Sequence, residues 1–94
     1  MKTAKILEVV ARYRQQFEEM GIPKKRMDPT KYLGDLEPRE RLAHAHYLLD
    51  GIVHLAQNPE KRGRTGRHLG SVQTILCYEN FYTLNELTRH NRPD

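Results

Sequence analysis

The sequence predicts an all-α protein, a small up-down helical bundle of three main helices plus a short C-terminal helix. Apolar residues recur every three or four positions in three segments, helix start and stop signals flank these segments, and no segment alternates apolar and polar residues as a strand does. With 94 residues, 37% of them apolar, and no Trp, the chain is long enough for one domain with a thin core. We therefore expect a single helical domain over residues 1–94.

A first helix is predicted over residues 4–20, with Thr3 as its N-cap and Gly21 as the left-handed residue that follows it. One apolar stripe runs along this helix with spacings of 4, 3, 4 and 3, and it consists of Ile6, Val10, Tyr13, Phe17 and Met20. A stripe this regular is typical of packing within a bundle or against a partner helix.

The second helix is predicted to begin at Pro38, a favoured first helical position, and to run to Gln57. Before it, residues 22–37 are expected to form a loop because Pro23 and Pro29 interrupt helices, and apolar residues in this loop predict that it packs over one end of the bundle. The second helix has the most apolar face, which consists of Leu42, Ala45, Leu49, Ile52, Val53 and Ala56. We therefore expect it to be the central helix.

The third helix is predicted to start at Asn58-Pro59-Glu60, where Asn58 can cap and Pro59 takes the first position, but it is expected to be firm only over residues 65–79. Gly63, Gly66 and Gly70 each disfavour a helix by roughly 1 kcal/mol relative to Ala, so its start is expected to be frayed. Its inward stripe consists of Leu69, Val72, Gln73 and Leu76.

The short fourth helix has the clearest start signal of the chain. Thr83 and Glu86 have the spacing of a capping box, and Tyr82 and Leu87 have that of a hydrophobic staple. We expect this helix to end near His90.

The composition argues against a membrane or secreted protein. No run approaches the roughly 18 apolar residues that a membrane span needs, and no apolar region follows the charged N-terminus as it does in a secretory signal. Cys77 is the only cysteine, so the chain cannot form an internal disulfide. We expect a cytoplasmic protein in which Cys77 is a buried structural thiol.

Two segments carry the surplus of positive charge, since residues 22–32 and 59–68 each hold four basic residues against one acidic residue. The candidates for contact with an anion or a nucleic acid are Lys24, Lys25, Arg26, Lys61, Arg62, Arg64 and Arg67. Near Thr65, the N–H groups of a helix start and several arginines could hold a phosphate, although a solvated loop has the same composition. The glycines match neither a Walker loop nor a dinucleotide fingerprint. Binding of a nucleic acid would require both segments to share one face.

A polar ridge is predicted on the second helix, where His46, Asp50 and His54 lie four residues apart. The two histidines are about 12 Å apart along the helix axis, so one ion cannot bridge them and no metal is expected. Asp50 is expected to accept a hydrogen bond from one imidazole, and Gln73 is expected to pair with His46 or His54. No catalytic signature and no cofactor motif is present in the sequence.

Residues 39–94 resemble a set of small uncharacterised proteins of bacterial and phage or prophage genomes. The resemblance rests on the segments Ala43–Asp50, Arg67–Gln73, Tyr82–Leu87 and His90–Pro93. It implies a helical protein of bacterial or phage origin, and it implies no catalytic or binding residue.

Two function classes remain open at this point. The first is a non-enzymatic accessory or protein-interaction protein that acts through a helical surface, with another copy of the chain or a different protein as its partner. The second is a nucleic-acid-binding module that uses the basic residues at 24–26 and 61–67. An enzyme would need a polar cleft around the ridge residues and Gln73.

Overall fold

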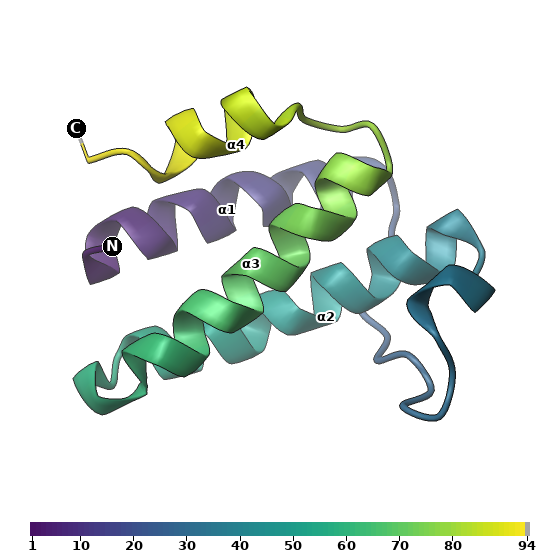
Figure 1. Cartoon of the computed structure of the whole chain (residues 1–94), viewed down its shortest axis with the longest axis horizontal. Helices are drawn as coiled ribbons and strands as arrows, with labels where there is room; N and C mark the ends of the chain where they lie inside the picture. Colours follow the sequence, from purple (N-terminus) through teal and green to yellow (C-terminus); the bar gives the residue numbers. More distant parts are fainter. Residues whose placement is uncertain (94) are drawn as a thin grey trace.

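The computed structural model describes residues 1–93, and every regular element in them is helical (Figure 1). The elements are α1 (Thr3–Glu19), the 3-10 turn η1 (Leu33–Asp35), α2 (Pro38–Ala56), the 3-10 turn η2 (Pro59–Lys61), α3 (Arg62–Tyr78) and α4 (Leu84–Asn91). The Cα radius of gyration is 12.8 Å, close to the roughly 12 Å expected of a compact domain of this length. The prediction of an all-α fold is confirmed for the described residues.

Helix α2 packs against both α1 and α3, and α1 also packs against α4. Figure 1 shows α4 alongside α1, with α3 crossing over α2. The eight-residue helix α4 thus lies between α1 and α3. One pocket is lined by α1 and α4, and a second by α3 and α4. None of the helices in the described part of the chain is long and apolar enough to cross a membrane.

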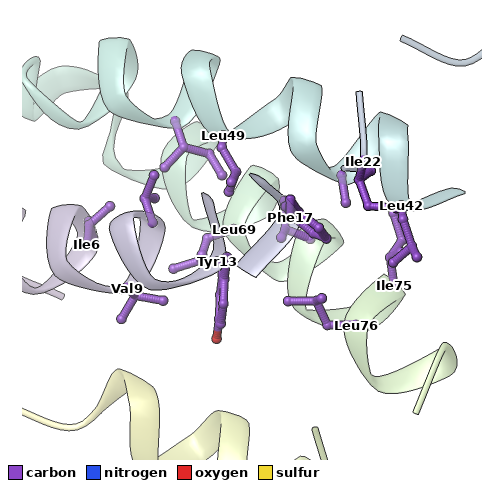
Figure 2. Packing of buried hydrophobic residues seen from close by; sticks show 14 of the residues in the cluster. Ile6, Val9, Tyr13, Phe17, Ile22, Leu42, Leu49, Leu69, Ile75 and Leu76 are labelled. Atoms are coloured by element: carbon purple, nitrogen blue, oxygen red, sulfur yellow. The ribbon is translucent and has the colours of Figure 1, made fainter. Parts of the chain in front are cut away.

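The core is formed mainly by the stripes that the periodicity predicted (Figure 2). Ile6, Val10, Tyr13 and Phe17 of α1 are all buried against the rest of the chain. Met20, the last member of the predicted stripe, is 47% exposed because α1 ends one residue earlier. The stripe of α1 is thus used inside the domain and leaves no apolar face for a partner helix.

The prediction that α3 becomes firm only at Thr65 is wrong, since the helix begins at Arg62. Asn58 caps the 3-10 turn η2, which leads directly into α3. Thr65 is buried and donates a hydrogen bond from its hydroxyl to the carbonyl oxygen of Lys61. Burial of Thr65 and Leu69 on the inward side compensates for the low helix propensity of the glycines on the outward side.

The helix ends follow the sequence signals with one exception. Gly21 has a φ of +68° and, with Ile22, closes α1 by hydrogen bonds to the last turn. Thr83 and Glu86 form the predicted capping box at the start of α4. Thr3 is the exception, because it is the first residue of α1 rather than its cap, and its hydroxyl donates to the carbonyl oxygen of Ala56 at the end of α2.

Candidate functional site

The two basic segments do not form one surface. The main-chain N–H of Lys25 donates to the carbonyl oxygen of Ala43, which places residues 24–26 beside the first half of α2. Residues 61–67 lie past the end of α2, at the turn into α3, and Figure 1 shows the two segments at opposite ends of the molecule. The shared face that nucleic-acid binding by both segments requires is absent from the described residues.

The polar ridge is not a cluster either. His46 is buried, and its Nδ1 donates to the carbonyl oxygen of Ile22 at 2.8 Å, whereas His54 is exposed. Asp50 lies at the surface, 2.8 Å from Arg14 and 3.2 Å from Lys24. Burial acts to raise the pKa of Asp50, but these two cations outweigh it and lower the pKa. Within residues 1–93, no three His, Cys, Asp or Glu side chains come close enough to hold a metal ion.

Gln73 pairs with neither His46 nor His54, contrary to the prediction. Its side-chain amide exchanges hydrogen bonds of 2.7 and 3.0 Å with the amide of Asn91 on α4. Its Nε2 also donates to the hydroxyl of Tyr13 on α1 at 3.2 Å. A polar chain thus runs through the interior between α1, α3 and α4, and we name it the Gln73 network.

The Gln73 network continues to a histidine. The hydroxyl of Tyr13 lies 2.7 Å from Nδ1 of His90. The Tyr13 oxygen also accepts a hydrogen bond from Nε2 of Gln73, so this hydroxyl connects α3 with α4. Burial and the charge of Arg12 lower the pKa of His90, and burial raises the pKa of Tyr13. Both groups are therefore uncharged at neutral pH.

We expect the free energy of unfolding to fall when the pH is lowered from about 7.5 to 5.5. His90 and His44 both have a pKa below the ordinary value of 6.5 in the folded protein, His44 through burial and the charge of Arg26. The unfolded chain therefore binds more protons below about pH 6.5, and stability is lost as the pH falls toward the folded-state pKa values. Urea unfolding at several pH values measures this, and His90→Gln should flatten the slope. The control is Gln57→Ala at an exposed position, which removes no titratable group and should leave the slope as it is.

A largely apolar groove lies between α3 and α4, and we name it the α3–α4 groove. It has a volume of about 500 Å³. Its lining includes Gly70, Thr74, Cys77 and Tyr78 of α3 and Leu84 and Leu87 of α4. Tyr78 is 68% exposed and Leu84 is 72% exposed, so both edges of the groove present apolar side chains to solvent. Cys77, which was expected to be buried, is only half-buried here.

Sequence reasoning missed the groove because Leu84 and Tyr78 belong to no periodic stripe. Leu84 is the first residue of α4, and Tyr78 is the last of α3. Their proximity depends on the turn between the two helices, where Asn80 adopts a φ of +65°. Asn tolerates this left-handed conformation better than most residues, and that is the one signal in the sequence that could have indicated the turn.

Comparison with known proteins assigns no function to this site: no family model matches the chain, and neither a curated protein nor a solved structure matches it significantly. The function must therefore be argued from the geometry alone.

Proposed function

We propose that this protein is a non-enzymatic interaction protein whose α3–α4 groove receives an amphipathic helix of a different protein. The observation that carries this proposal is the pair of apolar side chains, Tyr78 and Leu84, left largely exposed on the two edges of an apolar groove. Large apolar side chains that flank a hollow mark sites of interaction more often than isolated surface residues do.

The surface of α3 next to the groove allows a helix to come close. No atom lies within 4 Å of the position that a Cβ would occupy at Gly66 or at Gly70. Since neither residue has a side chain, a partner helix can pack directly against the backbone of α3, and its apolar residues can then lie between Tyr78 and Leu84.

The charge of α3 favours an acidic partner over a second copy of the chain. Helix α3 holds Arg62, Arg64 and Arg67 in its first two turns and no acidic residue. Acidic residues that flank the apolar face of a partner helix would be attracted to these arginines, whereas a second α3 helix offers no acidic residue to pair with them.

The test uses a matched pair of glycine substitutions. Gly70→Gln places a side chain in the α3–α4 groove, and Gly51→Gln places the same side chain on the exposed surface of α2, where no atom lies within 4 Å either. Both changes replace a helical glycine, so both should raise the free energy of unfolding by about 0.5–1 kcal/mol. Only Gly70→Gln should impair binding.

The ligand in this test is a synthetic amphipathic helix with Leu on one face and Glu on its flanks, and fluorescence anisotropy measures its Kd. We expect the Glu-flanked peptide to bind more tightly than a Lys-flanked analogue, and Gly70→Gln to weaken binding about tenfold or more, as the loss of buried apolar contact implies. Equal binding of both peptides, or an equal effect of Gly51→Gln, contradicts the proposal. Sedimentation that shows a dimer lost only in Gly70→Gln would instead make a second copy the occupant.

We further infer that α1, α2 and α3 constitute an up-down bundle, which is supported by the packing of α2 against both neighbours. Bacterial or phage origin remains a hypothesis that rests on the resemblance of residues 39–94. A cytoplasmic location is likewise a hypothesis, supported by a single cysteine that can form no internal disulfide.

A further inference from the structure

A second hollow lies on the other side of α4, between α4 and α1, and its lining is polar. It has a volume of about 400 Å³, and we name it the α1–α4 pocket. Arg12 of α1 and Arg89 and Arg92 at the end of α4 all line it, together with His90. The sequence did not predict a site at these arginines. Arg12 and Arg89 are nearly 80 residues apart in the chain, and neither lies in a segment with a surplus of positive charge like those at 22–32 and 59–68.

The acidic residues of the α1–α4 pocket already have partners. Glu8 forms an ion pair of 2.9 Å with Lys5. Glu86 accepts a hydrogen bond from the main-chain N–H of Thr83, and this bond lowers the pKa of its carboxyl group. The lining therefore holds four basic side chains, those of Lys5, Arg12, Arg89 and Arg92, against these two acidic ones.

The three arginines, in contrast, have no ion pair within residues 1–93. Arg12 lies close enough to His90 and Tyr82 for its charge to act on both groups. Three guanidinium groups line one pocket in which basic side chains outnumber the two glutamates, and such an excess of positive charge favours binding of a phosphate anion.

We propose that the α1–α4 pocket binds a small molecule that carries a phosphate group, which Arg12, Arg89 and Arg92 hold by charge-assisted hydrogen bonds. The planar fork of a guanidinium matches two phosphate oxygens at once. The pocket volume falls in the range of small-molecule sites. A nucleic-acid strand would need a longer basic track with aromatic side chains for stacking, and Tyr82, the aromatic residue nearby, packs edge-on against His90.

The Gln73 network prepares the pocket for such a ligand. Tyr13 contacts Nδ1 of His90, so Nε2 is the ring nitrogen left to contact a ligand. When Nε2 carries a hydrogen, it can donate to a phosphate oxygen. The side chain is held in place by Tyr13 and by the ring of Tyr82, so little order is lost on binding.

The experiment is an NMR titration of the ¹⁵N-labelled protein with ribose 5-phosphate and, separately, with inorganic phosphate, each against sodium chloride of equal ionic strength. We expect saturable shifts at Arg12, Arg89, His90 and Arg92 with either phosphate and none with chloride. The double variant Arg12→Gln with Arg89→Gln should raise the Kd for either phosphate about tenfold or more.

The control is the double variant Arg62→Gln with Arg64→Gln, which removes the same charge from exposed positions of α3. Its Kd should change by less than about twofold, as weak long-range attraction implies. Shifts that do not saturate, or an equal loss in the control, would overturn the proposal. Tighter binding of an oligothymidylate through Arg12 and Arg89 than of ribose 5-phosphate would also overturn it, because the ligand would then be a nucleic acid.

Discussion

Replacing Arg41 by Met is expected to lower the free energy of unfolding by about 3–5 kcal/mol, because it leaves a buried carboxylate without its counter-charge. The side chains of Arg41 and Glu79 are only 9% and 11% exposed, and their Nε and Oε1 atoms are 2.6 Å apart. Nη1 of Arg41 also donates to the carbonyl oxygens of Leu33 and Leu36, so one side chain joins α2, the η1 turn and the end of α3. For a domain of this size the loss is a large part of the total stability.

Urea unfolding measures this loss, and Arg39→Met is the matched control. Arg39 lies two residues away on the exposed side of α2 and, within residues 1–93, its side chain donates only to the carbonyl oxygen of Gly21, so its removal should cost about 1 kcal/mol or less. A second substitution, Glu79→Leu in the Arg41→Met background, should restore part of the stability, since the unpaired charge is then gone. Equal losses in Arg41→Met and Arg39→Met would show that the ion pair contributes little.

The ion pair also links stability to the proposed function. The guanidinium of Arg41 lies 5.1 Å from the centre of the Tyr78 ring, which forms one edge of the α3–α4 groove. Any folded fraction of Arg41→Met should therefore bind the amphipathic peptide more weakly, because Tyr78 loses the group that positions its ring.

The helices were predictable because their periodicity is a local property of the chain. The second helix was predicted over 38–57 and is observed over Pro38–Ala56, since Pro38 and the apolar face determine it directly. Asn58 and Pro59 indicated where the turn into α3 begins, and Asn58 is indeed its cap. The regular helix between Arg62 and Thr65 was not predictable, because the glycine propensities that argue against it are outweighed by burial of Thr65, a tertiary effect.

The candidate site was much less predictable than the fold. Tyr13 reads as a member of an apolar stripe, yet its hydroxyl joins Gln73 and His90, which lie 60 and 77 positions away. The spacing of His46, Asp50 and His54 predicts one polar ridge. In the structure His46 is buried, whereas Asp50 and His54, one and two turns further along α2, are exposed. The spacing of residues along one helix predicts which of them share a face of that helix. It does not predict which side chains of other helices they contact, because those contacts depend on how the helices pack.

Replacing Phe17 by Ala is expected to lower the free energy of unfolding by about 3–5 kcal/mol, the usual cost of removing a large aromatic side chain from a core. Phe17 is completely buried and packs against the rings of His46 and Phe81, which come from α2 and from the turn after α3. Its removal therefore leaves a cavity where three parts of the chain meet, and the small core has few other contacts with which to close it.

Met20→Ala is the control, because Met20 continues the same sequence stripe but lies at the surface. Urea unfolding should show a loss of less than about 1 kcal/mol for this variant.

The two variants, Phe17→Ala and Met20→Ala, also distinguish the two roles that the apolar stripe of α1 could have, packing inside one chain or packing against a helix of a second chain. If Phe17→Ala kept its stability at low protein concentration but lost self-association in sedimentation, the stripe would be an interface between copies. A loss of stability that does not depend on protein concentration identifies it as the core of one chain, and the interaction surface must then be sought elsewhere, at the groove beside α3.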